Sequence, residues 1–356
     1  MITVVGLLAM PPMLEALGLE GRPVTLAGRL TGGGLWGVDR NSWPAIGPGG
    51  ALAGVEVQGN ASLARYAQVM DLRPVDWQGR QVLGVAGQGT TEAARPDPDL
   101  AAEIARQIID AGDHPAEHLA WRLPMIGIWA ASRLRAQGRC HSGGDVVARR
   151  AGDAVRVIDR RPRFAGYFAV EERRLTHALH RGGHSAPMTR EAFLMGDAAV
   201  LLPWDPRRDR VLVIEQFRFA PAMRGDPQPW LLEPIAGRVD AGETPEAAIA
   251  REAREEAGLD LRRLIHAFDA YPSPGAVCEF LFHYVGIADL PDGTAGIHGL
   301  DSESEDIRGH LMDRADLSAM VAAGRITNGP LIALSLWLDA RAADLGVEPA
   351  PGPGGS

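Results

Sequence analysis

Short apolar runs bounded by turn residues follow one another along the second half of the chain. Runs of about four to eight residues that are rich in branched and aromatic side chains are typical of strands. The sequence therefore predicts strands at residues 198–202, 211–216, 264–271 and 280–287. The polar segment 205–209 (DPRRD) separates the first two runs and is typical of a hairpin turn.

Helical patterns lie between and after these strands. Thr244 followed by Pro245 is a typical helix start, because a hydroxyl can cap the first turn and proline has the required φ. The good helix formers that follow predict a helix that ends at Gly258. Two more helices are expected at 313–324 and 330–343. Strand-rich segments around helices predict an α/β/α sandwich with a mixed sheet, in a chain of the α+β class.

A change of composition in the middle of the chain indicates two domains, for which 356 residues are sufficient. A helical pattern at 115–137 is followed there by the loose segment 138–153. The expected organisation is an amino-terminal domain at 1–112, a helical connector at 113–159, a second domain at 160–346 and a disordered Pro/Gly-rich tail at 347–356.

The composition excludes several classes of function. A net charge of −9 argues against nucleic acid or an anionic membrane surface as the partner. Every basic residue is an arginine, which excludes lysine-based chemistry such as a Schiff base. Cys140 and Cys278 lie too far apart to indicate a zinc site or a disulfide framework. The amino terminus has no basic signal-peptide region and no run is long enough to span a membrane, so we expect a cytoplasmic protein.

Three glutamates gather on the helix expected at 244–258. At 3.6 residues per turn, Glu252 and Glu256 are roughly 40° apart around the helix axis, and Glu255 lies beside them. Carboxylates on one side repel each other and resist ionisation. A hard divalent cation removes this cost, and Mg²⁺ is the natural ion where phosphates supply further ligands.

The alternative is a solvated helix whose charges pair with one another, such as Arg251 with Glu255 at i, i+4. Two residues before the helix favour the functional interpretation. Gly237 and Glu243 complete the seven fixed positions of the pattern G-x5-E-x7-R-E-x-x-E-E-x-G, which ends at Gly258.

This pattern resembles the Nudix box of the Nudix hydrolases, which cleave a nucleoside diphosphate linked to another group. The resemblance implies that Arg251 is not a metal ligand but orients the site by pairing with Glu243. It also implies a site for Mg²⁺, with Mn²⁺ as the alternative. The ligands that it implies are Glu252, Glu255, Glu256 and the carbonyl oxygen of Ala236.

The resemblance extends beyond the box. From about residue 161 to 344 the chain is similar to ADP-ribose diphosphatases, in segments such as EQFRF and PWLLEPIAG. Pro274, 15 residues after Leu259, is a feature of that subgroup. Arg218 then contacts the substrate, since a guanidinium fork suits phosphate oxygens, although a strand-end arginine in solvent is the alternative. Glu279 is expected near the metal and the substrate, and Glu233 is a further candidate.

The same resemblance assigns the attacking water to Glu303 in the DSESED segment, with Glu305 as its competitor. Together with Glu256 and Arg251, Glu303 then catalyses metal-assisted hydrolysis of ADP-ribose to AMP and ribose 5-phosphate. A pyrophosphatase for another nucleotide sugar or dinucleotide, such as GDP-mannose or NADH, remains open. So does a non-catalytic ADP-ribose sensor in stress (tellurite) tolerance. Enzymes of this type are commonly homodimers, which is the expectation here.

The first 112 residues are similar in arrangement to the gamma-glutamylcyclotransferase-like fold, a small β-barrel with flanking helices that is fused to Nudix domains in some tellurite-resistance proteins. Their chemistry differs. The family's Y-G-T-L loop is Val5-Gly6-Leu7-Leu8 here, and Asp71 and Asp76 are the only acids where a catalytic glutamate is expected. A non-catalytic domain is therefore predicted, either for docking or regulation or as a stabilising addition.

Overall fold

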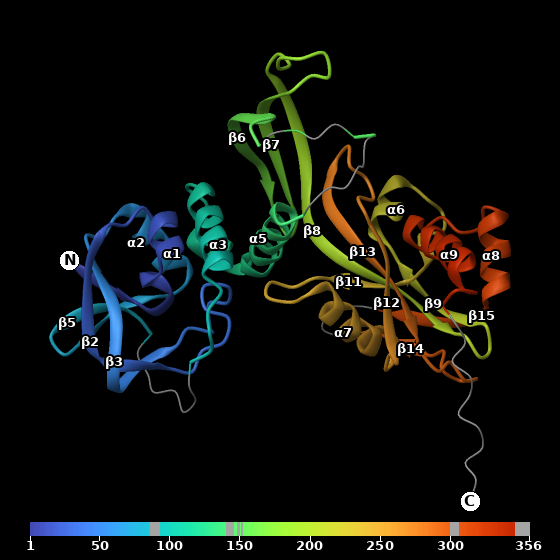
Figure 1. Cartoon of the computed structure of the whole chain (residues 1–356), viewed down its shortest axis with the longest axis horizontal. Helices are drawn as coiled ribbons and strands as arrows, with labels where there is room; N and C mark the ends of the chain where they lie inside the picture. Colours follow the sequence, from blue (N-terminus) through green and yellow to red (C-terminus); the bar gives the residue numbers. More distant parts are fainter. Residues whose placement is uncertain (86–92, 140–145, 148–149, 151, 300–305, 346–356) are drawn as a thin grey trace, which may run out of the picture. The chain divides into compact units, whose positions relative to one another are not determined.

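The computed structural model describes residues 1–85, 93–139, 146–147, 150, 152–299 and 306–345. It divides into two compact units (Figure 1). The first contains Met1–Gly196, Asp240–Gly242 and Gly275–Val277, and the second contains Asp197–Val239, Glu243–Pro274 and the chain from Cys278 onward. The tail expected at 347–356 lies outside the described residues. Among the helices described, none is both long and apolar enough to cross a membrane.

The first unit begins with a five-stranded mixed sheet in the order β2-β3-β1-β5-β4. Its elements are β1 (Ile2–Val5), the 3-10 helix η1 (Gly6–Ala9), α1 (Pro11–Ala16), β2 (Gly21–Thr31), β3 (Ala45–Val57), α2 (Ala61–Val69), β4 (Arg73–Trp77) and β5 (Arg80–Gly84). The helices α1 and α2 contribute buried residues such as Met13 and Tyr66 to a core that they share with β1 and β3.

The predicted β-barrel is wrong, because this sheet is open in the residues that the structure describes. β2 and β4 are its two edges, and they approach each other through side chains alone: Trp77 and Gln78 donate to the carbonyl oxygen of Ala27 at 2.9 and 3.0 Å. Each edge strand also carries a proline, Pro23 in β2 and Pro74 in β4. A proline cannot donate to a ladder, which opposes closure by pairing these strands.

Three helices follow: α3 (Pro98–Asp110), α4 (Ala116–Trp121) and α5 (Leu123–Gln137). Asp97 caps α3 by accepting from the backbone N–H groups of Asp99 and Leu100. The single helix predicted at 115–137 is in fact two helices that meet at Arg122. Pro124 explains the break, since a proline cannot donate the backbone hydrogen bond that would continue α4 into α5.

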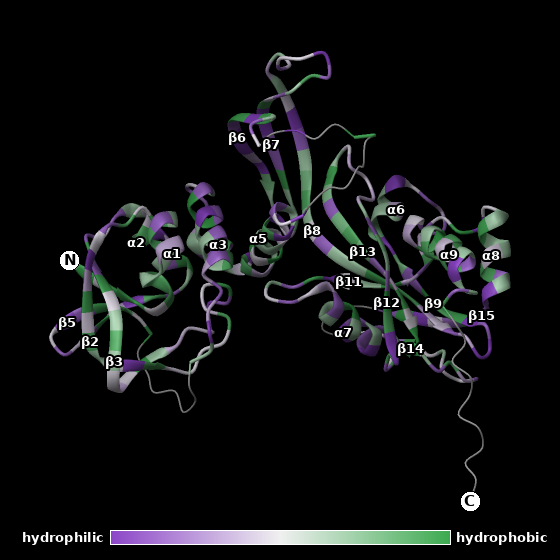
Figure 2. Ribbon diagram, viewed as in Figure 1, coloured by the Kyte–Doolittle hydropathy of each residue, from purple (hydrophilic) through white to green (hydrophobic). Residues whose placement is uncertain are grey.

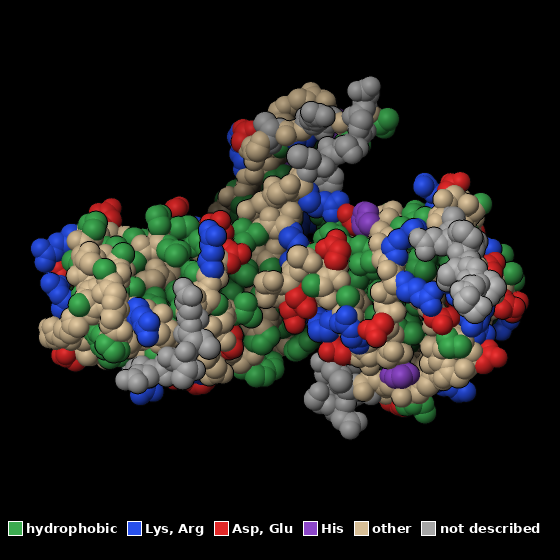
Figure 3. Space-filling model, turned by 60° about the horizontal axis from the view of Figure 1, so that its bottom comes forward, with side chains coloured by type: hydrophobic (Ala, Val, Ile, Leu, Met, Phe, Trp, Pro, Cys, Tyr) green, Lys and Arg blue, Asp and Glu red, His purple; other side chains and the backbone are tan. Residues whose placement is uncertain are grey.

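Next come the antiparallel strands β6 (Val155–Ala165), β7 (Ala169–His177) and β8 (Met188–Asp205). Arginines of β6 form ion pairs with glutamates of β7, as in Arg160–Glu171 at 3.1 Å and Arg163–Glu172 at 2.5 Å. In the register of the ladder Arg160 is opposite Arg173, so its contact with Glu171 is diagonal, which long side chains can still reach. Figure 3 shows the same intermixing of acidic and basic side chains on the face that it draws.

The second unit holds most of the remaining elements. They are β9 (Arg210–Phe217), α6 (Phe219–Arg224), β10 (Trp230–Glu233), β11 (Ile235–Arg238), α7 (Pro245–Ala257), β12 (Arg263–Ala270), β13 (Val277–Ile287), β14 (Ile297–His298), β15 (Ile307–Asp313), α8 (Arg314–Ala322) and α9 (Gly329–Arg341). The strand order is β12-β13-β8-β9-β15-β14, while β10 pairs with β9 and β11 pairs with β8. These bounds confirm the four strands and three helices predicted for this region.

Alternation along the central strands places a core on each face of this sheet. In β8, Ala199 and Leu201 pack with α7, whereas Val200 and Leu202 pack with α8 and α9. Hydrophobic residues dominate β13 and the adjoining part of β8 in Figure 2. Helices therefore cover both faces, as the predicted α/β/α sandwich requires, and the chain is of the α+β class.

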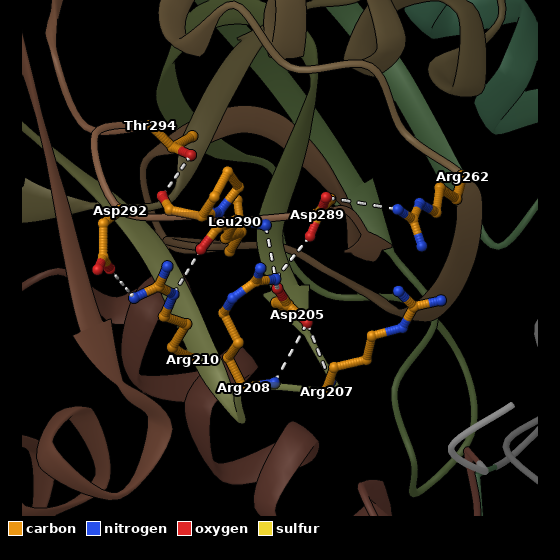
Figure 4. A network of polar contacts seen from close by, with 10 residues as sticks. Asp205, Arg207, Arg208, Arg210, Arg262, Asp289, Leu290, Asp292 and Thr294 are labelled. Carbon is orange, nitrogen blue, oxygen red and sulfur yellow. Dashed lines mark hydrogen bonds and ion pairs between the residues drawn. The ribbon is translucent and has the colours of Figure 1, made fainter. Parts of the chain in front are cut away.

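The hairpin turn between β8 and β9 is held by the carboxylate of Asp205, which is 1% exposed (Figure 4). It accepts from the backbone N–H of Leu290 at 3.0 Å and of Arg207 at 2.9 Å, and from the guanidinium of Arg208 at 2.6 Å. The loop after β13 is thus fixed to the predicted turn at 205–209.

We expect Asp205→Ala to destabilise the protein by about 3 kcal/mol, because the buried N–H of Leu290 then has no acceptor. Burial opposes ionisation of Asp205, but the backbone and arginine donors prevail and its pKa lies below the ordinary 3.8. A depressed carboxyl pKa stabilises the fold above the unfolded pKa, so the difference from wild type should shrink below pH ~4. Denaturation midpoints against pH measure this, and Asp292→Ala, in the same network but 98% exposed, should leave them unchanged.

Candidate active site

The glutamate-rich helix is α7, and its ends are those that the sequence predicts. The hydroxyl of Thr244 accepts from the backbone N–H of Ala247 at 3.2 Å, and Gly258 ends the helix with a φ of +61°. The buried side of α7, which includes Ile249 and Ala253, packs on the sheet. This packing fixes the rotation of the helix about its axis and therefore the direction of its glutamates.

Glu252 lies directly against β11. A Cβ atom on Gly237 would come within 1.8 Å of Oε1 of Glu252, so no residue other than glycine fits while the carboxylate stays in place. The side chain of Glu252 is only 13% exposed. The glycine of the sequence pattern is explained by this close approach of helix side chain and strand backbone.

Gly237→Ala should lower turnover roughly 10- to 100-fold, because the added methyl group displaces Glu252. The steady-state rate and the unfolding midpoint should be measured together. Gly329→Ala is the matched control, since nothing lies within 4 Å of its Cβ position. Wild-type turnover in Gly237→Ala would show that the position of Glu252 does not matter.

Glu256 is the most deeply placed of the three glutamates, at 3% exposed. Its Oε2 accepts from the backbone N–H of Ala236 at 3.1 Å. Ala236 in turn pairs with Val200 of β8, at the centre of the sheet. Glu256 and Ala236, both of which were predicted as metal ligands, are therefore neighbours.

Arg251 connects the acidic residues of the pattern. Its guanidinium donates to both carboxylate oxygens of Glu243 at 3.2 Å, to Glu252 at 2.6 Å and to Glu255 at 3.1 Å. The hydrogen bonds to Glu243 raise the pKa of Arg251, burial acts in the opposite sense, and Glu252 raises it further. The predicted pairing with Glu243 is present, and so is the i, i+4 pair with Glu255 that the alternative interpretation expects.

Within the described ranges, no three His, Cys, Asp or Glu side chains form a ready metal-binding cluster. Arg251 currently neutralises Glu252 and Glu255. The donor set nevertheless fits a hard divalent cation, because it consists of oxygen atoms and Gly237 leaves space for a carboxylate that any Cβ would fill.

Arg218 lies at the end of β9 and is not the solvated arginine of the alternative prediction. It donates from Nε and Nη2 to one oxygen of Glu233 at 2.8 and 2.6 Å. Glu233, on β10, is 6% exposed, whereas Arg218 is 40% exposed. A buried carboxylate thus fixes the direction of a partly exposed guanidinium.

Glu279, on β13, is electrostatically coupled to the same region. Burial raises the pKa of its carboxyl group, Arg238 and Arg218 lower it, and Asp197 raises it again. Arg238 also supplies a carbonyl oxygen to Arg251 at 3.3 Å. Sequence reasoning missed Asp197 and Arg238, although Arg238 directly follows the glycine of the box and could have been found from that position.

Three further residues were predicted from the sequence: Pro274, Glu303 and Glu305. Pro274 is exposed and lies in the turn that precedes β13. Glu303 and its competitor Glu305 lie outside the described residues.

A strand glycine that receives a helix carboxylate, beside a network of further glutamates and one arginine, suits the binding of cations and phosphates. Comparison with known proteins identifies the class. Residues 195–334 match the NUDIX domain family. The chain therefore belongs to the Nudix hydrolases, and it is an enzyme of that family.

Individual relatives have more specific names than the family. An ADP-ribose pyrophosphatase of Escherichia coli K12 is 41% identical over 184 residues, which are 52% of this chain and 87% of the relative. An ADP-ribose pyrophosphatase of Haemophilus influenzae is 34% identical over 193 residues, 54% of this chain and 88% of the relative. A GDP-mannose pyrophosphatase of Yersinia pestis is 35% identical over 152 residues, 43% of this chain and 75% of the relative.

Proposed function

We propose that the protein hydrolyses the diphosphate of ADP-ribose, giving AMP and ribose 5-phosphate. The observation that carries this proposal is the packing of Glu252 and Glu256 against β11, with Arg251 bonded to both Glu252 and Glu243. The identity to two ADP-ribose pyrophosphatases over most of their length supports the choice of substrate.

In this proposal Glu252, Glu255, Glu256 and the Ala236 carbonyl hold Mg²⁺, or Mn²⁺ in its place. When bound, the cation neutralises negative charge on the diphosphate oxygens. Arg251 holds Glu252 and Glu255 in fixed directions before the cation arrives, since its guanidinium bonds to both.

Substrate positioning is assigned to the neighbouring strands. Arg218, whose guanidinium is held by Glu233 and is 40% exposed, is assigned to bind a phosphate oxygen. Glu279 lies in the same electrostatic environment, where burial raises the pKa of its carboxyl group, and we assign it a place beside the substrate. We assign to Glu303 the orientation of the water that attacks phosphorus, with Pro274 shaping the substrate side of the site.

GDP-mannose is the second candidate substrate, because the Yersinia pestis relative acts on it according to its name. A panel of ADP-ribose, GDP-mannose, NADH and a diadenosine polyphosphate should be assayed with the full-length protein. The proposal requires kcat/KM for ADP-ribose to exceed the others at least about tenfold, which is ~1.4 kcal/mol of discrimination. A preference for GDP-mannose would reassign the substrate, and binding of ADP-ribose without release of AMP would make the protein a sensor.

We also propose a homodimer formed through the β6 side of the first unit. β6 pairs with β7 alone among the described strands, and Val157, Ile158 and Phe164 on it are 45%, 51% and 59% exposed. An exposed apolar edge strand is a surface for pairing with a second chain. Light scattering of the eluting protein measures its mass, and a single chain of 38.0 kDa would contradict the dimer.

We propose that residues 1–112 form a non-catalytic module. The loop Val5-Gly6-Leu7-Leu8 forms the end of β1 and the start of η1, and Leu7 and Leu8 are buried in the core rather than available to a ligand. Release of 5-oxoproline from gamma-glutamyl dipeptides by the full-length protein would contradict this proposal.

A further inference from the structure

A pocket of about 310 Å³ lies within the first unit, between the helices α3 and α5 and the hairpin β6–β7. This volume is at the lower end of the range for sites that bind small molecules. The residues that line it belong to the segments 107–129, 160–171 and 194–195, so it shares no residue with the candidate active site.

Arg122 lines this pocket at the junction of α4 and α5. Its Nε is buried and has no hydrogen-bond partner among the residues that the structure describes. Burial also lowers the pKa of the guanidinium. A buried donor without an acceptor costs free energy, and native proteins rarely keep one unless it serves a purpose.

The acidic residues of the pocket are already neutralised by other arginines. Asp110 bonds to Arg160 at 3.1 Å, and Glu171 bonds to Arg160 at 3.1 Å and also to Arg173. Arg122 is therefore an additional positive charge in the pocket rather than a partner of these carboxylates.

The beginning of α5 adds to this positive character. Arg122 is the N-cap residue of this 15-residue helix, and no side chain caps it. Met125 and Ile126, in the first turn, line the pocket. The amino-terminal end of a helix carries a partial positive charge that attracts anions, although the carboxyl end of α4, which also lies at Arg122, opposes part of it.

Aromatic side chains form another part of the lining: Trp129 from α5, Phe164 from β6 and Tyr167 from the turn after it. Flat ring faces of this kind stack on the rings of ligands. We propose that this pocket binds a small organic anion with a flat ring, its anionic group on Arg122 and its ring against these aromatic side chains.

The test uses the fluorescent aromatic anion 8-anilino-1-naphthalenesulfonate with the full-length protein. We expect one saturable site, and binding about tenfold weaker in Arg122→Gln, the usual scale for loss of one charge-assisted contact. Tyr167→Ala, at a position that is 56% exposed, should also weaken binding without disturbing the fold. Arg156→Gln is the control, because it removes the same charge from an exposed arginine that does not line the pocket.

Two further readouts separate binding from folding and from the Nudix reaction. Arg122→Met should keep or raise the unfolding midpoint, since it removes a buried Nε that has no hydrogen-bond partner among the described residues. All these variants should keep the hydrolytic activity of the wild type, so a failure of the proposed substrate would not affect this test. Equal affinity of wild type and Arg122→Gln, or no saturable binding to the wild type, would overturn the pocket assignment.

Discussion

Treatment with EDTA is expected to abolish the release of AMP from ADP-ribose, and added Mg²⁺ or Mn²⁺ is expected to restore it. The reason lies in the charge of the site: without a cation, one arginine, Arg251, pairs with both Glu252 and Glu255, and the remaining negative charge repels a diphosphate. The assay should follow AMP by chromatography at several free Mg²⁺ concentrations.

Thermal unfolding supplies an independent measurement of the same cation. A ligand that binds the folded state alone raises its stability, so Mg²⁺ should raise the unfolding midpoint of the wild type. Full activity in EDTA, with a midpoint that does not respond to Mg²⁺, would exclude a metal site formed by the box glutamates.

Glu256→Gln is expected to reduce turnover on the order of 10²–10³-fold while the protein folds normally. Glutamine has almost the same shape and keeps an oxygen for the N–H of Ala236, so the packing at this 3% exposed position should survive. What is lost is the negative charge that the cation needs. Circular dichroism and the Mg²⁺-dependent shift of the unfolding midpoint should accompany the kinetics, and the shift should disappear.

Glu246→Gln is the matched control on the same helix. Glu246 is exposed, lies in the first turn of α7 and accepts a hydrogen bond from the hydroxyl of Tyr284 at 2.9 Å. Its replacement should leave turnover close to that of the wild type. Equal losses in both variants would mean that any lost charge on α7 lowers activity, and Glu256 would have no special role.

The sequence predicts the sandwich and α7 well because their signals are local. Thr244, Pro245 and Gly258 determine the helix ends through the backbone of a few neighbouring residues. The pairing of Arg251 with Glu243 could also be predicted from the sequence, since both residues belong to one short pattern.

Contacts between segments that are far apart in the sequence could not be predicted in this way. Nothing local shows that Glu233 holds Arg218, or that Asp197 and Arg238 surround Glu279, because these pairs meet only after β8, β9 and β13 have assembled. The open amino-terminal sheet has the same cause, since closure depends on edge pairing between β2 and β4 that strand propensity does not encode.

The strand β8 has a consequence for how this protein can be altered. Its residues 188–194 pair with β7, and residues 198–201 support β11 and thereby the backbone at Ala236 and Gly237. Any exchange of the leading half for another module must therefore keep this strand whole, or the support of β11 beneath Glu252 and Glu256 will be lost. Recombination points before residue 155, ahead of the β6–β7 hairpin, are the safer places to join such hybrids.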